Sequence, residues 1–230
     1  ITKLPRLYTP FALQSGKEIL LSKEHAHYLK NVMRKNDGDQ IRLFNGKDGE
    51  WICALEFQSK KEALASPLQK IKEQSHSPQQ VHAYFAPIKK NRMDFLIEKA
   101  VELGVTDLHP VLTRNTEVRK VNEERIRTQI IEAAEQCERL DIPTLHGLSS
   151  LTDILKDPPD TLYVALERSE GLSCQNLKID NYFAFLVGPE GGFTNEEIKH
   201  INLCKNFKKL SLGDQILRAE TATIKILSII

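Results

Sequence analysis

Residues 183–194 read FAFLVGPEGGFT, and this stretch decides the fold class. Its first five residues are apolar and have the length of a buried strand. The strand passes directly into a glycine-rich loop, after which Thr194 and Glu197 have the spacing of a capping box that opens a helix. A buried strand followed by a tight turn and a helix is the repeating unit of an α/β domain with a parallel sheet.

The same alternation of strand and helix extends over residues 80–230. Further strands are expected at 81–85, 105–112, 161–166 and 207–212, and further helices after Asn91, at 123–138 and from about Leu217. The helix after Asn91 has apolar residues at the i, i+3, i+4, i+7 and i+8 spacing of an amphipathic helix, namely Met93, Leu96, Ile97, Ala100 and Val101. The pattern predicts an α/β domain with a mainly parallel sheet.

The N-terminal part has a different pattern, with short strands around turns such as Asn45-Gly46. Such a pattern predicts a small β-barrel over residues 1–72. One helix is expected to interrupt it from Ser22 to Met33, burying Leu29, Val32 and Met33. Residues 73–79 are polar and read as a linker to a second domain at 80–230.

Composition excludes several classes of protein. The 230 residues carry 32 basic and 31 acidic side chains and 40% hydrophobic residues, as in soluble globular proteins. No apolar run approaches the roughly 20 residues that span a bilayer, and no secretory signal is visible, so a cytoplasmic protein without membrane contact is expected. The four cysteines form no C-x-x-C pair and the seven histidines no H-x-x-x-H pair, so no metal site is expected.

Charge divides unevenly between the two parts. Residues 1–79 carry 13 basic and 9 acidic side chains, a net charge of +4, which leaves 19 basic and 22 acidic, or −3, for residues 80–230. A basic N-terminal part permits contact with nucleic acid but does not require it.

Three strand ends in the second part are chemically unusual. Ligands of open α/β sheets sit beyond the carboxyl ends of the strands, and here the loops at 166–168, 188–193 and 213–218 occupy such positions. Their glycines fit neither the dinucleotide-binding nor the P-loop spacing. Arg218 stands where the last helix begins, and a cation there opposes the helix dipole, so a ligand or acidic partner is expected beside it.

Several segments together carry a resemblance to a known family. Residues 90–105, 132–137, 186–194, 211–213 and 216–222, in this order, look like the bacterial small-subunit (16S) ribosomal RNA uridine-N3 methyltransferases of the SPOUT superfamily. Residues 4–8 and 27–34 also resemble the N-terminal domain of that family. The resemblance implies a PUA-like RNA-binding barrel, a C-terminal α/β domain with a deep trefoil knot, and a homodimer in which each active site is bordered by the partner subunit.

The resemblance also implies a cofactor, a substrate and site residues. S-adenosylmethionine would methylate N3 of a uridine in ribosomal RNA of the small subunit, which is either free or within the assembled subunit. We assign catalysis to Arg218. The cofactor-binding residues would be Leu166, Glu167, Gly188, Pro189, Glu190, Gly191, Gly192, Leu212, Gly213, Leu217, Arg218, Thr221 and Ala222. The RNA-binding residues would be Arg6, Arg34, Lys89, Lys90, Arg92 and Arg114.

Two alternatives stay open at this point. Gln215 stands where the family often has a basic residue, and this departure leaves room for an RNA-binding ribosome assembly factor without catalytic activity. The same cofactor pocket would also serve a SPOUT enzyme that methylates a different RNA position.

Overall fold

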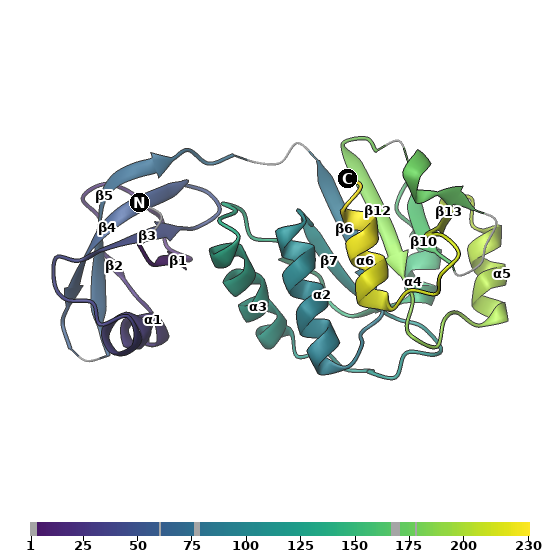
Figure 1. Cartoon of the computed structure of the whole chain (residues 1–230), viewed down its shortest axis with the longest axis horizontal. Coiled ribbons are helices and arrows are strands. Elements are labelled where there is room, and N and C mark those ends of the chain that lie inside the picture. The colour runs from purple at the N-terminus through teal and green to yellow at the C-terminus, as the bar shows by residue number, and fades with distance from the viewer. Residues whose placement is uncertain (1–3, 60, 76–78, 167–170, 178) are drawn as a thin grey trace. The chain divides into compact units, whose positions relative to one another are not determined.

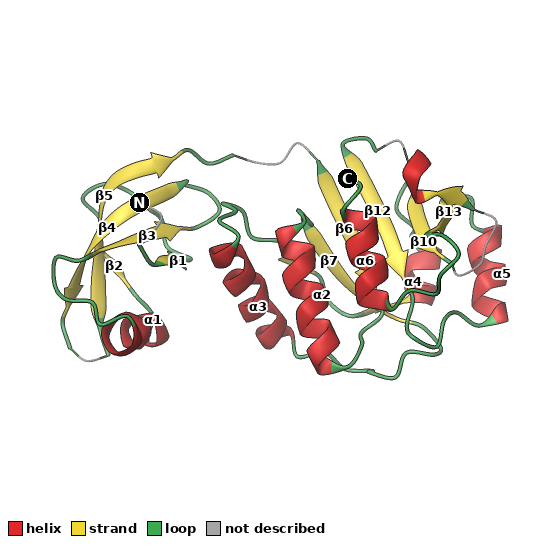
Figure 2. Cartoon of the chain, viewed as in Figure 1, coloured by secondary structure: helices red, strands yellow, loops and turns green. Residues whose placement is uncertain are grey.

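A computed structural model describes residues 4–59, 61–75, 79–166, 171–177 and 179–230 (Figures 1 and 2). The chain divides into two compact units, residues 1–76 with 134–142 and residues 77–133 with 143–230. The segment 134–142 thus groups with the N-terminal unit, although its place in the sequence lies within the predicted second domain. In the described part of the chain, no helix has both the length and the apolar character needed to cross a membrane.

The N-terminal unit is built on a five-stranded sheet in the order β1-β3-β4-β5-β2. Only the β1–β3 pair is parallel. All five strands contribute to one hydrophobic core, which α1 and the π-helical segment η1 also enter. The elements are β1 (Arg6–Tyr8), β2 (Ile19–Leu20), α1 (Lys23–His27), η1 (Tyr28–Val32), β3 (Gln40–Phe44), β4 (Glu50–Phe57) and β5 (Ala63–Lys72).

The helix expected from Ser22 to Met33 exists, but it changes from an α-helix to a π-helix at Tyr28. Ser22 caps α1, and Leu29 is fully buried as predicted. The prediction that Val32 and Met33 are buried is wrong, because both are exposed. The backbone N–H of Met33 donates to the carbonyl of Tyr28, five residues back, and this wider turn shifts the helical register that the pattern assumed.

A buried ion network crosses the sheet of the N-terminal unit. The carboxylate of Glu50 is 0% exposed and lies 3.0 Å from Nε of Arg6, 3.2 Å from Nη1 of Arg42 and 3.3 Å from Nζ of Lys72. Arg42 also donates to Glu138 at 2.8 Å. Buried charges are tolerated only when they are paired in this way, so the network holds β1, β3, β4 and β5 in register with the segment 134–142.

The structure contradicts the prediction that Arg6 contacts RNA. Its side chain is 3% exposed, stacks on the ring of Phe44 at 3.7 Å, and donates from its Nη atoms to the carbonyls of Ala134 and Arg139 at 2.8 Å. The sequence could not reveal this role, because the acceptors lie more than a hundred residues away along the chain.

The Glu138 carboxylate should make the N-terminal unit sensitive to acid. The hydrogen bond from Arg42 is the main cause that lowers the pKa of Glu138 from an ordinary 4.5 to about 2. A carboxyl whose pKa is lower in the folded state stabilises the fold above its unfolded pKa and loses that contribution as pH falls. Stability should therefore decline from about pH 4.5 toward pH 2. Urea unfolding at several pH values should show a smaller decline in Glu138→Gln, and an equal decline in both proteins would contradict this assignment.

The second unit is an eight-stranded parallel sheet with helices on both faces. The strand order is β11-β13-β10-β12-β6-β7-β8, with β9 also paired to β7, and every pair is parallel. The strands are β6 (Gln80–Phe85), β7 (Asp107–Leu112), β8 (Thr144–Leu145), β9 (Ser149–Ser150), β10 (Leu162–Ala165), β11 (Leu172–Ser173), β12 (Tyr182–Val187) and β13 (Phe207–Ser211). The helices are α2 (Lys90–Glu102), α3 (Glu123–Gln136), α4 (Leu151–Lys156), η2 (Cys174–Asn176), α5 (Asn195–Leu203) and α6 (Ala219–Leu227).

Local sequence explains the helices of this unit. All five apolar positions predicted for α2 are buried, and α2 lies alongside α6 in front of the sheet (Figure 2). Thr194 and Glu197 form the predicted capping box of α5. On the other face, α4 and α5 share a core with alternate residues of β12, including Ala184 and Leu186. The α/β fold with a parallel sheet is therefore confirmed.

Candidate active site

A cavity of about 610 Å³ lies beyond the carboxyl ends of three neighbouring strands. Because β10 pairs with both β12 and β13 in parallel, the carboxyl ends of these strands meet at one edge of the sheet. The lining residues come from the ends of β10 and β12, from described residues that follow the three strands, from Ile198 of α5 and from the start of α6. The predicted convergence of the three strand ends is therefore present in the structure.

Most of the residues predicted to hold a cofactor line this cavity. Glu167 lies outside the described residues. Thr221 is exposed and is not among the lining residues, because the first turn of α6 presents Ala219 and Ala222 to the cavity instead. The predicted residues that do line it are Leu166, Gly188, Pro189, Glu190, Gly191, Gly192, Leu212, Gly213, Leu217, Arg218 and Ala222.

The loop after β12 leaves no room for a side chain at Gly188 and little room at Gly191. A Cβ atom on Gly188 would lie 2.7 Å from the ring of Phe193, and one on Gly191 would lie 3.2 Å from Asn115. The Asn115 amide donates to the carbonyls of Gly191 and Gly192 at 3.0 and 3.1 Å. Asn115 therefore fixes the course of this loop, a role that no local pattern in the sequence indicates.

The loop after β13 is fixed by a lysine from α6. Lys225 donates from Nζ to the carbonyl of Leu212 at 2.7 Å. Gly213 follows with φ +100°, a conformation that residues with a Cβ rarely adopt. This arrangement turns residues 214–218 along the cavity before α6 begins.

Gly213→Ala is expected to weaken ligand binding in this cavity. A Cβ atom at a left-handed position costs about 1–2 kcal/mol, so the free loop should relax away from the observed course. Binding would have to restore that course, so affinity should fall by roughly 5–30-fold. Isothermal titration calorimetry with the cofactor would measure the change.

Gly104→Ala is the matched control for this variant. Gly104 has a similar φ of +91° at the end of α2 and is not a lining residue. The Gly104→Ala variant should have a lower unfolding midpoint than the wild type and the same affinity for the cofactor. Equal affinities for Gly213→Ala and the wild type would show that the conformation of Gly213 does not shape the site.

Arg218 lies at the wall of the cavity as the N-cap residue of α6. Its side chain is exposed, does not cap the helix, and has no hydrogen-bond or ion-pair partner among the described residues. A guanidinium without a partner beside the amino end of a helix is unfavourable unless an anion or a polar ligand offsets it. The structure therefore leaves Arg218 available to a ligand.

Arg92, which is predicted to bind RNA, lies in the first turn of α2. It pairs with the cavity-lining carboxylate of Glu190, and its Nε lies 3.9 Å from Glu220 on α6. Glu220 is buried, and its Oε2 has no hydrogen-bond partner within the described ranges. Arg92 thus joins α2 to the glycine loop and α6. Its contact with RNA stays a prediction.

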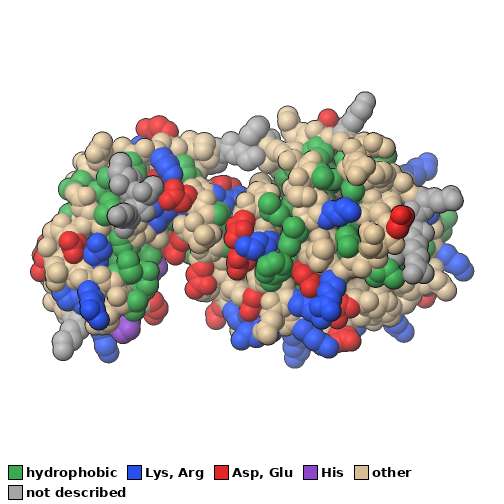
Figure 3. Space-filling model, in the orientation of Figure 1, with side chains coloured by type: hydrophobic (Ala, Val, Ile, Leu, Met, Phe, Trp, Pro, Cys, Tyr) green, Lys and Arg blue, Asp and Glu red, His purple; other side chains and the backbone are tan. Residues whose placement is uncertain are grey.

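The remaining predicted RNA-binding residues are exposed cations. These are Arg34 in the N-terminal unit and Lys89, Lys90 and Arg114 in the second unit. Lys89 lies 3.4 Å from Glu117, but both side chains are about 70% exposed, so this pair is weak. Figure 3 shows Lys and Arg side chains gathered over one end of α2.

Sequence reasoning missed several apolar residues of the cavity wall. Phe193, Ile198 and Ile216 are lining residues, and Ile216 is 56% exposed. An apolar residue beside glycine and polar residues in the 213–218 loop is the signal that could have indicated a ligand contact. Apolar walls combined with backbone groups at glycines suit a flat, nucleoside-sized ligand, and the volume lies within the usual range for small-molecule sites.

Two family models match the sequence. Residues 75–230 match an RNA methyltransferase domain, and residues 21–68 match an RNA methyltransferase PUA domain. The two matches follow the same division into an N-terminal and a C-terminal part as the fold.

Relatives and solved structures extend the similarity over nearly the whole chain. The Rickettsia conorii protein named ribosomal RNA small subunit methyltransferase E is 35% identical over 96% of this chain and 93% of its own length. A Legionella pneumophila structure, described as a methyltransferase in complex with the bound cofactor SAM, is 31% identical, has a TM-score of 0.90 and covers 99% of this chain and 96% of its own. A Neisseria gonorrhoeae ribosomal RNA small subunit methyltransferase E bound to S-adenosyl methionine is 29% identical, has a TM-score of 0.87 and covers 98% and 95% of the two chains.

Proposed function

Since the chain belongs to the RNA methyltransferase family that its residues 75–230 match, we propose that it transfers a methyl group from S-adenosylmethionine to N3 of a uridine in small-subunit ribosomal RNA. The observation that carries this proposal is the cavity at the carboxyl ends of β10, β12 and β13, at whose wall Arg218 has no partner among the described residues. Two solved relatives with this fold contain S-adenosylmethionine, and a relative that matches 96% of this chain is named as a methyltransferase of small-subunit ribosomal RNA.

The cavity suits S-adenosylmethionine in size and in the chemistry of its walls. Backbone groups around Gly188 to Gly192 and near Leu212 would hold the polar parts, and Leu166, Leu217 and Ala222 would pack against the adenine. Glu190 is an acidic residue of the described wall, and its carboxylate, which also pairs with Arg92, would add negative charge near a positively charged ligand. When bound, the cofactor supplies a methyl group on a positively charged sulfur.

Arg218 would stabilise the base while it reacts. Uridine N3 carries a proton that must leave before the nitrogen can accept a methyl group. If the acidity of N3 lies near that of Cys or Tyr, ionising it at neutral pH costs roughly 2–4 kcal/mol. A preorganised donor aimed at a developing anion contributes about 2.7–4 kcal/mol. The stabilisation that one guanidinium can give beside the uracil carbonyls is therefore large enough to offset the cost of ionising N3. The N3 proton can pass to solvent.

Three further features belong to this proposal. The last strands and α6 would form the trefoil knot that the family resemblance implies, and two copies of the chain would form the active dimer. Modification of ribosomal RNA would place the protein in the cytoplasm. The oligomeric state can be measured by light scattering of the purified chain.

The test is transfer of labelled methyl to small ribosomal subunits and to naked ribosomal RNA that lack the modification. Nucleoside analysis by mass spectrometry should find N3-methyluridine. Detection of ribose methylation or of another methylated base would show that the protein modifies a different position from the one proposed. Cofactor binding without any transfer to either RNA form would favour an assembly factor.

RNA binding by the exposed cations predicts a change in salt dependence. Removing one phosphate contact should reduce the slope of log K against log salt by roughly 0.7–0.9. Lys89→Ala, Lys90→Ala and Arg114→Ala should each do so, and Arg34→Ala tests the N-terminal unit separately. Filter binding at several salt concentrations would measure the slopes. An unaltered slope in all four variants would remove these residues from the RNA site.

A further inference from the structure

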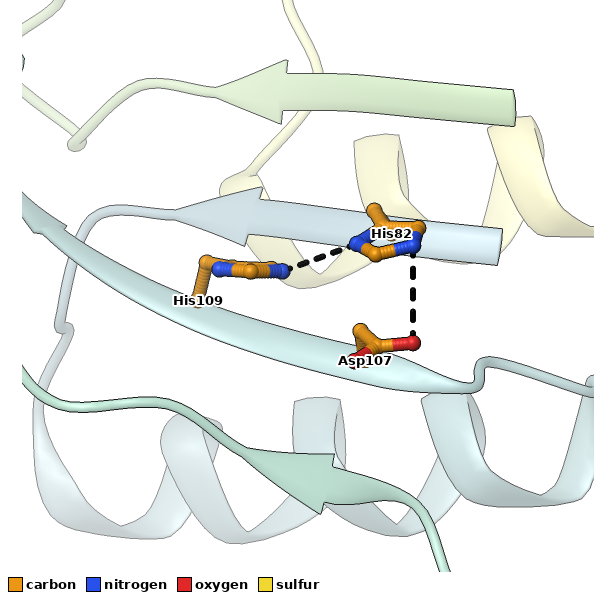
Figure 4. Close-up of side chains that lie close together, drawn as sticks. All are labelled: His82, Asp107 and His109. Atoms are coloured by element: carbon orange, nitrogen blue, oxygen red, sulfur yellow. Dashed lines mark hydrogen bonds and ion pairs between the residues drawn. The ribbon is translucent and has the colours of Figure 1, made fainter. Parts of the chain in front are cut away.

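Three histidines and an aspartate gather on one face of the sheet of the second unit, at its β7 side. His82 lies on β6, Asp107 and His109 lie on β7, and His146 follows β8. In the parallel pairing of β6 with β7, His82 is the register partner of Asp107. Because alternate residues of a strand point to the same face, His109 lies on that face beside Asp107. Figure 4 shows the three side chains of β6 and β7 turned toward one another.

The ligand atoms of these side chains are close together. Nδ1 of His82 lies 3.0 Å from Nε2 of His109, and Nε2 of His82 lies 3.5 Å from Oδ2 of Asp107. One donor atom from each of the three residues can be chosen so that all lie within 4.8 Å of one another. His146 contacts the other carboxylate oxygen of Asp107 through Nε2 at 2.7 Å.

One nitrogen of the cluster lacks a hydrogen-bond partner. Nε2 of His82 is buried and makes no hydrogen bond to any described residue, since 3.5 Å from Asp107 is longer than a good hydrogen bond. Buried polar atoms of this kind usually have a partner such as an ion or a water. A cation between His82 and Asp107 would satisfy both the nitrogen and the carboxylate.

We propose that His82, Asp107 and His109 bind one Zn²⁺ ion, with His146 as the residue that orients the carboxylate of Asp107. Two imidazoles and one carboxylate are an established ligand set for zinc. Ligand atoms around a tetrahedral zinc lie roughly 3.3 Å apart, given zinc–nitrogen bonds of about 2.0–2.1 Å. One donor atom from each residue already lies within 4.8 Å of the others. The 3.0 Å separation involves Nδ1 of His82 and the 3.5 Å separation involves its Nε2, so the His82 ring must move to bring one nitrogen close to both partners.

The bound ion would tie the sheet together and take no part in methyl transfer. His82 is near the start of β6 and Asp107 is the first residue of β7, whereas the cavity lies beyond the carboxyl ends of β10, β12 and β13. In a parallel sheet these are opposite edges. Zinc would join β6 to β7 and, through His146, support the segment that follows β8. The inference is thus independent of the proposed function.

Zinc binding can be measured directly on the full chain. The protein would be purified without a histidine tag, stripped with a chelator and titrated with zinc chloride in a calorimeter. We expect one saturable site per chain and a higher unfolding midpoint with zinc. His82→Asn and His109→Asn should abolish saturable binding, and His146→Asn should weaken it by about 10–100-fold, as is usual for residues that orient a metal ligand.

His200→Asn is the control, because this exposed histidine of α5 lies outside the cluster. It should bind zinc as the wild type does. Cofactor binding by each variant reports whether it is folded, and His146→Asn provides the test if a ligand variant fails to fold. Absence of a saturable site in the wild type, or equal affinity in the wild type and His146→Asn, would overturn the proposal. Neither result would bear on methyl transfer.

Discussion

Arg218→Ala is expected to reduce the rate of methyl transfer by about 10²–10³-fold, the usual effect of removing one donor to a developing anion. The guanidinium lies at the cavity wall and has no partner in the described part of the chain, so its removal breaks no ion pair there. Cofactor affinity should change far less than the rate, because backbone groups of the glycine loops would hold the cofactor. Single-turnover transfer of labelled methyl and calorimetry with the cofactor measure the two quantities separately.

Two further variants make this test specific. Arg218→Lys keeps the charge but loses the planar pair of donors, so its rate should fall between those of the wild type and alanine variants. Arg127→Ala removes an exposed arginine on α3 that only pairs locally with Glu123 and contacts a backbone carbonyl, and its rate should be unchanged. If Arg218→Ala turned over at the wild-type rate, the proposed role of the guanidinium would be wrong.

Glu50→Ala is expected to destabilise the N-terminal unit by about 3–5 kcal/mol, because removal of one partner leaves buried charges unpaired. The carboxylate is 0% exposed and faces three cations, of which Arg6 and Arg42 are themselves buried. Urea unfolding followed by the fluorescence of Trp51, which lies on β4 of the same unit, would measure the loss.

The controls for this variant separate charge from packing. Glu50→Gln keeps nearly the same volume and should lose a similar amount of stability if charge is the cause. Glu62→Ala removes an exposed carboxylate of the same unit and should stay within about 0.5 kcal/mol of the wild type. A loss for Glu50→Ala no larger than that for Glu62→Ala would contradict the importance of the network.

Local pattern was enough to predict the elements that form the cavity, whereas β5, β8, β9, β11 and α4 were not predicted. The apolar stripe of α2, the capping box of α5 and the strands β10, β12 and β13 all appear within a residue or two of their expected places. Parallel strands bring their carboxyl ends to one edge, so the glycine-rich ends at Gly188 and Gly213 could be expected to meet. The limit of this approach appears at η1, where one wide turn exposes Val32 and Met33.

Roles that depend on distant partners were not predictable in this way. Arg6 resembled a surface cation until the carbonyls of Ala134 and Arg139 were seen to accept its hydrogen bonds. His82 and His109 are 27 residues apart, and no short spacing indicates that they face each other. Asn115 and Gly191 are separated by 76 residues and meet only in the folded unit.

The sequence by itself determined the main strands and helices of the second unit, the parallel α/β class, the family and the strand ends at the cavity, because each is encoded in the spacing of neighbouring residues. Only the tertiary structure decided that Arg6 is buried, that Arg92 pairs with Glu190, and that three histidines gather around Asp107. These contacts depend on strand register and on burial. Burial and the groups nearby in space change the energy of a charge or an imidazole far more than the adjacent residues of the chain do.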